Sequence, residues 1–217
     1  VDASKAPPWA LDAPAVEHVA EFGFPLTHPV TLITGGNGVG KSTLLEGIAR
    51  AWGFKVEGGP WGVDKPGAHD PMFGALTLRT GARAKAGYFL RGETHTRVTE
   101  FGERSHGESV LELTSRFAQD ALYLLDEPES GLSPVAQMAL VAQLHAIGEQ
   151  GAQVIAVTHS PIVLGVPGAE IVEVGEHGVD RGLEVEDTLA FRAMRDFLAD
   201  PHGIAEYMAD WAEGELG

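Results

Sequence analysis

One stretch of the chain has the residue types and the spacing needed to bind phosphate. Residues 35–43, Gly-Gly-Asn-Gly-Val-Gly-Lys-Ser-Thr, fit the Walker A pattern G-x-x-x-x-G-K-[S/T] at every defined position. Glycines allow tight turns that point backbone N–H groups at phosphate oxygens, Lys41 neutralises the phosphate charge, and the Ser42 hydroxyl is suited to ligate Mg²⁺. We therefore predict a nucleotide-binding loop made of Gly35, Gly36, Asn37, Gly38, Val39, Gly40, Lys41, Ser42 and Thr43.

Two acidic residues follow a second apolar run. Residues 121–125 are typical of a strand buried on both faces, and Asp126 and Glu127 come directly after it. A carboxylate at the end of a buried strand needs a partner, which a neighbouring phosphate loop would supply. We expect Asp126 to lie on the Mg²⁺ side of the site and Glu127 to polarise the attacking water. Taken alone, the same acids could form a solvated turn, but the phosphate loop favours the functional interpretation.

The residues around these motifs predict the elements that hold them. A β-branched run at 30–34 predicts a buried strand before the loop, and one apolar face at 42–52 predicts an amphipathic helix after it. Alternating strands and helices imply an α/β fold of the P-loop NTPase type, with a mostly parallel central sheet flanked by helices. The other expected elements are strands at 76–79, 88–91, 121–125, 153–158 and 170–174, and helices at 108–117, 134–149, 189–198 and 203–211.

Length and composition limit the function classes that remain. The chain has 217 residues, enough for a single α/β domain over 1–217, and its net charge of −16 gives no indication of nucleic-acid binding, although a local basic patch would allow it. Absence of cysteine excludes disulfides and thiolate metal sites. No apolar run approaches the roughly 20 residues of a membrane span, so we expect no membrane insertion. A cytoplasmic location is the simplest expectation for a protein that uses ATP.

Further motifs give the chain a resemblance to ABC-type ATPases. Asp126 follows Ser105 by 21 residues and His159 follows Asp126 by 33, an order similar to that of the ABC signature loop, acidic strand and switch histidine. Residues 130–133 occupy the place of the D-loop. More narrowly, from Phe22 onward the chain resembles a family of small, stand-alone bacterial ATPases, broadly called AAA family ATPases, within the ABC-type P-loop superfamily. The segments that carry this narrower resemblance are 87–93, 105–109, 124–129, 158–161 and 195–201.

The resemblance implies Mg-dependent ATP hydrolysis at the interface of a head-to-tail homodimer. Ser105 and Gly107 resemble the signature residues that contact the γ-phosphate bound to the other subunit. His159 would bond the γ-phosphate and the attacking water, and would serve catalysis with Glu127 and Lys41. Each role has a structural alternative, since Ser105 begins an S-x-x-E capping box and His159 could simply end a strand.

Three residues depart from the ABC pattern. Glu93 stands where ABC proteins have a lid glutamine, and it could reach the metal through water. His106 replaces the first glycine of the signature, which affects packing at the expected dimer interface. Ser133 replaces the D-loop aspartate, so communication between two composite sites would be weaker. The residue that contacts the adenine is left open between Phe22 and Phe24, and either could equally be core.

Several functions are compatible with these motifs, and we favour a stand-alone ATP-driven switch acting on an unknown protein partner. A transporter subunit would carry a helical docking subdomain between Lys41 and Ser105, and a DNA-repair head would carry coiled coils there. That interval has 64 residues, is rich in glycine and proline, and shows no heptads, which predicts a much-reduced helical subdomain. A small-molecule kinase rarely combines the Asp-Glu pair with a later switch histidine. Glu127 argues against a module that binds nucleotide without hydrolysis.

Overall fold

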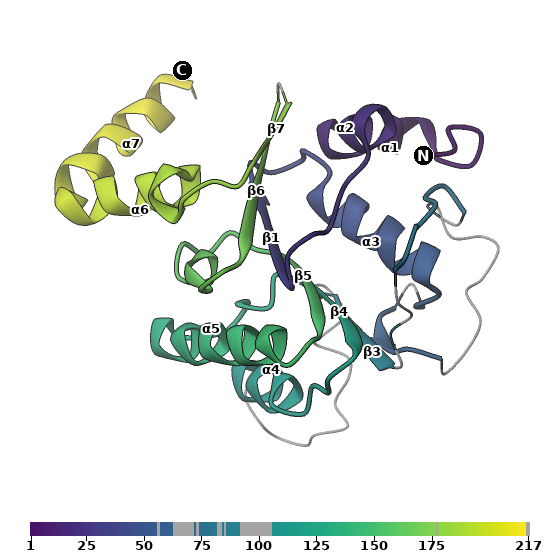
Figure 1. Ribbon diagram of the computed structural model, residues 1–217. Helices are drawn as coiled ribbons and strands as arrows, with labels where there is room; N and C mark the ends of the chain where they lie inside the picture. The colour runs from purple at the N-terminus through teal and green to yellow at the C-terminus, as the bar shows by residue number, and fades with distance from the viewer. Residues whose placement is uncertain are drawn as a thin grey trace.

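Short apolar strands form the centre of the protein (Figure 1). The computed structural model describes residues 1–55, 57–62, 72, 74–81, 84, 86–91, 106–176 and 178–215. Within these residues the strands form one sheet of seven, in the order β2-β3-β4-β5-β1-β6-β7. The strands are β1 (Val30–Gly35), β2 (Gly59–Pro60), β3 (Ala86–Leu90), β4 (Ala121–Asp126), β5 (Gln153–Val157), β6 (Glu170–Gly175) and β7 (Gly178–Arg181).

The five inner strands of this sheet run parallel, and the two edge strands run antiparallel to their neighbours. Strand β1 lies between β5 and β6, and β5 separates it from β4. In register, Leu32 lies beside Ala156, and Leu125 lies beside the same residue on the other side of β5. The carboxyl ends of β1, β4 and β5 therefore meet at one edge of the sheet, where ligands of open α/β sheets bind.

Helices cover both faces of the sheet because successive strand residues point to opposite sides. On β4, Leu122 and Leu124 pack into the core beneath α2 and α3, whereas Tyr123 and Leu125 pack into the core beneath α4 and α5. Figure 1 shows these two layers on either side of the strands. The helices are α1 (Pro8–Leu11), α2 (Pro14–Phe22), α3 (Lys41–Trp52), α4 (His106–Thr114) and α5 (Pro134–Glu149), with 3₁₀ turns at Val163–Gly165 and Val185–Asp187.

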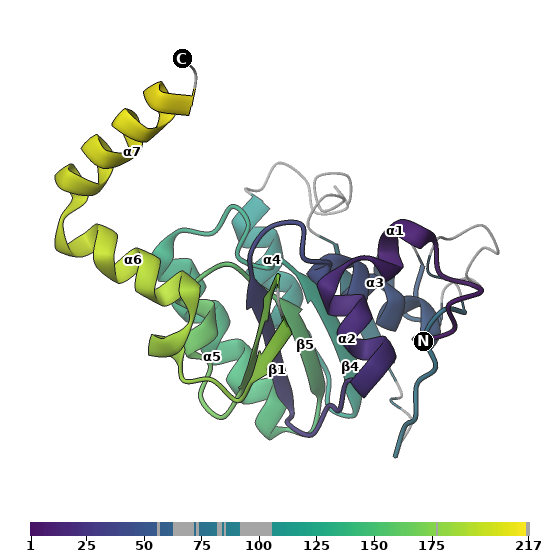
Figure 2. The same ribbon diagram turned by 90° about the horizontal axis from the view of Figure 1, so that it is seen from above.

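The last two helices extend away from the sheet. Helices α6 (Leu189–Ala199) and α7 (Pro201–Glu215) follow β7 and project beyond the rest of the protein, as seen most clearly in Figure 2. Thr188 caps α6 by accepting a hydrogen bond from the Phe191 N–H. Among the described residues, no helix is both long enough and apolar enough to cross a membrane.

Most of the expected elements are present within one to three residues of their predicted bounds. The strand expected at 76–79 is wrong, because residues 76–80 have no regular secondary structure. Sequence patterns also missed α1 and α2, although each begins with a proline at its first turn, a typical helix start. Between α3 and β4, the described residues contain α4 as their single helix.

Candidate functional site

The predicted phosphate loop connects β1 to α3 at the carboxyl edge of the sheet. Two of its glycines are required by geometry. Gly35 has φ 129° and a Cβ there would lie 2.0 Å from the Val174 carbonyl oxygen, while Gly40 has φ 88° and a Cβ there would lie 2.6 Å from Ala13 Cβ. The Ala15 N–H donates to the Val39 carbonyl at 3.0 Å, so α2 also holds the loop in place.

Lys41 lies under this loop as a buried cation. Its Nζ donates to the carbonyl oxygens of Gly35 at 3.1 Å and Gly36 at 2.5 Å. Burial lowers the pKa of the Lys41 ammonium, while the negative charges of Glu127 and Asp126 oppose that shift. An anion bound at the loop would offset the cost of burying this charge, so the geometry suits a phosphate ligand.

Ser42 and Asp126 are brought together from residues far apart in the sequence. The Ser42 hydroxyl donates to Asp126 Oδ1 at 3.0 Å, linking the start of α3 to the end of β4. Among the described residues, no three His, Cys, Asp or Glu side chains gather as an all-protein metal site. A hydroxyl and one carboxylate, completed by water and phosphate oxygens, are ligands that suit Mg²⁺ in phosphoryl-transfer sites. Ser42 and Asp126 therefore fit a nucleotide-bound Mg²⁺ ion.

Glu127 is held at the turn that follows β4. Its N–H donates to the Val157 carbonyl at 2.9 Å, and its backbone has φ 49°, a left-handed value that costs a non-glycine residue about 1 kcal/mol. Such strain is found preferentially at functional sites. Glu127 Oε1 lies 3.8 Å from His159 Nε2, and the two side chains are 45% and 39% exposed. Both groups predicted to act on water thus face the same open side of the site.

Glu129 is a residue whose role the sequence patterns did not reveal. One of its oxygens, Oε1, accepts hydrogen bonds from Thr158 Oγ1 at 2.7 Å, the His159 N–H at 2.8 Å and the Ser160 N–H at 3.2 Å. These donors lie about 30 residues after Glu129 in the sequence. Their contact with one carboxylate is therefore produced by the fold and not by a local sequence pattern. Glu129 therefore fixes the segment that carries His159.

The other residues that the sequence analysis singled out lie in α4, at the start of α5, or outside the described residues. Ser105 and Glu93 both lie outside the residues that the structure describes. Gly107 lies in the first turn of α4, which starts at His106. Ser133 has a structural role, because its side chain caps α5 by accepting a hydrogen bond from the Ala136 N–H at 3.2 Å.

A cavity of about 300 Å³ lies beside the phosphate loop and is lined by Lys41, Glu127, His159 and Trp9. Trp9 comes from α1 and is 59% exposed, and the sequence analysis did not single it out. Neither of the two phenylalanines considered there as adenine contacts is among the residues that line this cavity. Phe22 lies against His18 at the end of α2, with ring centroids 5.0 Å apart, and Phe24 lies under the Arg181 guanidinium, 4.6 Å from its ring centroid.

A second cavity, of about 480 Å³, opens on the other side of the phosphate loop. Gly36, Asn37 and His159 form one wall, and Met194 and Phe197 of α6 belong to the opposite wall. The candidate site therefore lies between the N-terminal helices and the projecting C-terminal helices. Its two open sides have different character, since one is polar and the other is lined by apolar side chains of α6.

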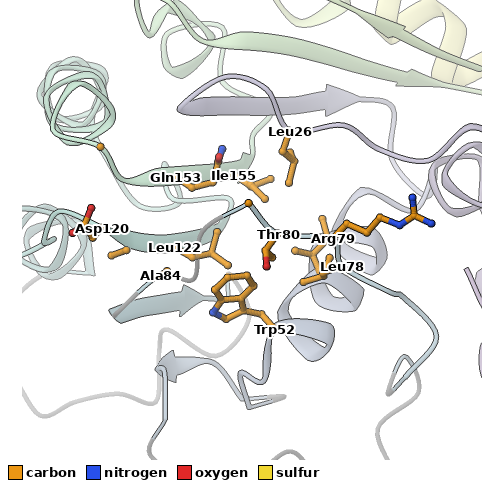
Figure 3. Close-up of a pocket in the computed structure, with 14 residues that line it drawn as sticks. Leu26, Trp52, Leu78, Arg79, Thr80, Ala84, Asp120, Leu122, Gln153 and Ile155 are labelled. Atoms are coloured by element: carbon orange, nitrogen blue, oxygen red, sulfur yellow. The ribbon is translucent and has the colours of Figure 1, made fainter.

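A further cavity, of about 500 Å³, lies at the opposite edge of the sheet (Figure 3). Figure 3 shows Trp52, Leu122 and Ile155 around it, where α3 ends and where β4 and β5 begin. Its walls are mainly apolar, and a 12-residue helix of about 17 Å separates it from Lys41. A nucleotide at the phosphate loop would not reach this cavity, so its size does not identify it as the nucleotide site.

Comparison with known proteins finds similarity to AAA-type domains and to an ATP-binding protein. Residues 67–165 match the family model described as "AAA domain, putative AbiEii toxin, Type IV TA system", and residues 17–100 match a model described as "AAA domain". The chain is also similar to the cytochrome c biogenesis ATP-binding export protein CcmA of Zymomonas mobilis subsp. mobilis. The identity is 28% over 148 residues, which cover 59% of this chain and 65% of the relative, less than two thirds of its length.

Proposed function

We propose that this chain, which is similar to small P-loop ATPases of the AAA/ABC type, binds Mg-ATP and hydrolyses it at a composite site between two copies of the chain. The observation that carries the proposal is the convergence of the phosphate loop with the end of β4. Ser42 and Asp126 are joined at 3.0 Å, and Lys41 lies beneath the loop. Glu127 and His159 lie at its open side.

The proposed chemistry divides the work among these side chains. Lys41 and the loop N–H groups hold the β- and γ-phosphates, and Mg²⁺ would neutralise charge that develops on the transferred group. Glu127 accepts a proton from the attacking water while the water oxygen bonds to the γ-phosphorus. The bond between the γ-phosphorus and the oxygen that leaves with ADP breaks. His159 orients that water and the γ-phosphate, and Glu129 keeps the His159 segment in place. Inorganic phosphate and ADP are the products.

We assign the base contact to Trp9. The indole is exposed in the cavity that also contains Thr43 and Lys41, so it can stack on a planar base while the phosphates occupy the loop. Aromatic stacking contributes about 1 kcal/mol beyond the area that it buries. This assignment replaces Phe22 and Phe24 as the candidates for the adenine contact.

Exposure of the catalytic groups supports a dimer. With Glu127 45% exposed and His159 39% exposed, bulk water would reach the γ-phosphate from the open side. A second copy could close this side with Ser105 and with Gly107 at the start of its α4, where a helix N-terminus favours an anion. Two ATP molecules would then be enclosed between the two copies, and hydrolysis would let the copies separate.

The names printed for the similar relative and family model point to narrower functions, namely an ATP-binding export protein and a toxin of a Type IV TA system. We favour a stand-alone switch over an export subunit, because the interval between Lys41 and Ser105 is only 64 residues and is rich in glycine and proline. A subunit that docks on a membrane partner would need a larger helical surface there. The target of the switch is thus proposed to be a protein outside the membrane.

Substitution of the proposed base tests this function. Glu127→Gln keeps the side-chain shape but cannot accept the proton, so hydrolysis should fall by at least about a hundredfold while ATP still binds. Because ATP contacts are needed for closure and hydrolysis ends it, a dimer should accumulate with ATP but not with ADP. Light scattering after size exclusion would report the mass in each state.

The matched variant for this experiment is Glu127→Gln combined with Ser105→Arg, which should bind ATP but fail to dimerise. A Glu127→Gln protein that binds ATP tightly yet stays monomeric would contradict the composite site. Wild-type hydrolysis by Ser105→Arg would lead to the same conclusion. The protein would then be a self-contained P-loop enzyme.

A further inference from the structure

One side chain of α5 connects the chain segments that follow β4 and β5. Gln137 lies near the start of α5 and is half-buried. Its Nε2 donates to the Leu132 carbonyl at 3.1 Å, and its Oε1 accepts a hydrogen bond from Ser160 Oγ at 2.6 Å. We call this pair of hydrogen bonds the Gln137 bridge. It joins the segment 127–133 to the segment 158–163.

The chemistry of its two partners requires both ends of the Gln137 amide. Ser160 is 8% exposed, and its Oγ accepts hydrogen bonds from the N–H groups of Ile162 at 3.1 Å and Val163 at 3.2 Å. A hydroxyl has two acceptor lone pairs and one proton, so the Ser160 proton is left for Gln137 Oε1. The Leu132 carbonyl can only accept, so it needs the amide nitrogen. A side chain of similar size without an amide cannot form the bridge.

The two bridged segments carry the groups that are proposed to act on water. Glu127 begins the first segment and His159 lies in the second, with Glu127 Oε1 3.8 Å from His159 Nε2. Because the two groups belong to different segments, contacts that hold the segments together also fix the position of one group relative to the other. Glu129 makes one such side-chain connection, and Gln137 makes a second from the adjoining helix.

The first segment is itself a fixed support for the bridge. The Ser130 N–H donates to the Glu127 carbonyl at 3.0 Å, and the Leu132 N–H donates to the Glu129 carbonyl at 2.9 Å. The side chain of Leu132 is buried in the core beneath α4 and α5. Two short turns therefore lead from Glu127 to an anchored residue, and the bridge continues from that residue into the second segment.

We propose that Gln137 is a positioning residue for the proposed hydrolysis, and that it holds His159 where His159 and Glu127 can act on the same water molecule. Gln137 is not among the described residues that line the cavity beside the phosphate loop, so it acts through His159 and not on the nucleotide. A displacement of about 1 Å in such a site can lower the rate about a hundredfold. The catalytic role rests on the proposed function, whereas the bridge itself does not.

Gln137→Met tests this role, because methionine has a similar length and lacks the amide donor and the amide oxygen. We expect kcat for ATP hydrolysis to fall about tenfold to a hundredfold, while the Kd for ATP measured by calorimetry changes by less than about twofold. In the His159→Ala background, the same substitution should lower the single-turnover rate by less than about twofold, since the group that Gln137 positions is already absent.

A second readout does not depend on hydrolysis. Amide hydrogen exchange of the full chain without nucleotide, followed by NMR, should be at least about tenfold faster at His159 and Ser160 in Gln137→Met, because the segment opens more readily without the bridge. Exchange in β1 should be unchanged, which would show that the variant keeps its fold. Ser160→Ala removes the bridge from its other end. Combined with Gln137→Met, it should lower kcat by no more than about twofold beyond the larger single loss.

The matched control is Gln153→Met. Gln153 is also half-buried, and its Nε2 also donates to backbone carbonyls, those of His28 at 2.8 Å and Pro29 at 3.3 Å. It lies at the start of β5, at the edge of the sheet opposite His159. This variant loses the same amide but no contact near the proposed site, so kcat and His159 exchange should be unchanged.

Four results would overturn the role assigned to Gln137. Losses from Gln137→Met and His159→Ala that multiply would show that Gln137 does not act through His159. Unchanged His159 exchange would show that the bridge does not hold this segment. An equal fall of kcat in Gln153→Met would show that the effect is not specific to the bridge. An inactive wild type whose His159 exchange still depends on Gln137 would overturn the proposed hydrolysis and leave the bridge as a structural feature, so the two failures can be told apart.

Discussion

The two edges of the central sheet are formed by the same strands but present different side chains. Strands β4 and β5 begin at an apolar cavity beside Trp52, and at their other ends they lead to Asp126, Glu127 and His159. What differs is the phosphate loop and the start of α3, which place N–H donors and the Lys41 cation at one edge, whereas the other cavity is lined mainly by apolar side chains together with Arg79 and Asp120.

The strongest test of this difference removes the cation from the polar edge. Lys41→Ala should weaken ATP binding at least about a hundredfold, ~2.7 kcal/mol, because charge-assisted hydrogen bonds to the phosphates are lost. The matched change at the apolar edge is Thr80→Val, which alters one side chain lining the other cavity and should leave ATP affinity unchanged. Calorimetry with Mg-ATP measures both. Similar losses in the two variants would mean that the edges are not distinct in function.

A smaller effect is expected from the residue that positions His159. Glu129→Ala removes the acceptor of three hydrogen bonds, so the His159 segment should loosen. We expect kcat to fall by about tenfold to a hundredfold with little change in ATP affinity, since Glu129 would not contact the phosphates. Glu129→Gln retains an acceptor oxygen and should recover part of kcat. If Glu129→Ala and Glu129→Gln lose the same amount of kcat, and both also lose thermal stability, the role of Glu129 is purely structural.

A still smaller effect, on the affinity for ATP, is expected from the proposed contact between Trp9 and the base. Trp9→Ala should raise the Kd for ATP about tenfold through loss of stacking, with kcat unchanged. Trp9→Phe keeps an aromatic ring and should retain most of the affinity. Inorganic triphosphate, which has no base, tests whether Trp9 contacts the base. Its affinity should be the same in the wild type and in Trp9→Ala. Quenching of tryptophan fluorescence on ATP binding offers a second readout that Trp9→Phe should diminish.

The smallest expected effect is the change of ATP affinity and of the free energy of unfolding with pH. Burial lowers the pKa of Lys41, so above that lowered pKa the empty site holds a neutral amine and ATP affinity should fall as pH rises through it. Stability should change in the opposite direction. Between the lowered pKa and the ordinary lysine value, the unfolded chain binds more protons than the folded one, so the free energy of unfolding rises with pH.

Both pH trends can be measured with one pair of proteins. Titrations of ATP binding and of urea unfolding across the alkaline range should show the two opposite slopes in the wild-type chain. Lys41→Met should remove the contribution of this residue to each slope. A wild-type affinity that stays constant across the range in which the unfolding free energy rises would contradict the assigned role of Lys41.

How much of the molecule could be predicted depended on whether the signal was local. The phosphate loop and the acids at the end of β4 could be proposed from the sequence because each is a short pattern next to an apolar strand. Trp9 and Glu129 were not assigned roles, because what makes them relevant is a set of contacts with residues distant in the sequence. The strand expected at 76–79 failed for the converse reason, since a local apolar pattern does not guarantee a pairing partner.

The order of strands has a consequence for how the protein is made. Ser42 and Asp126 lie 84 residues apart, and β5, which is later in the chain than both, inserts between β1 and β4. During synthesis the phosphate loop therefore emerges long before the strand that aligns it with its carboxylate. Such non-local parallel pairings form slowly and expose apolar strands meanwhile. A nascent chain that stops before Val157 would display the complete loop sequence and yet lack the site.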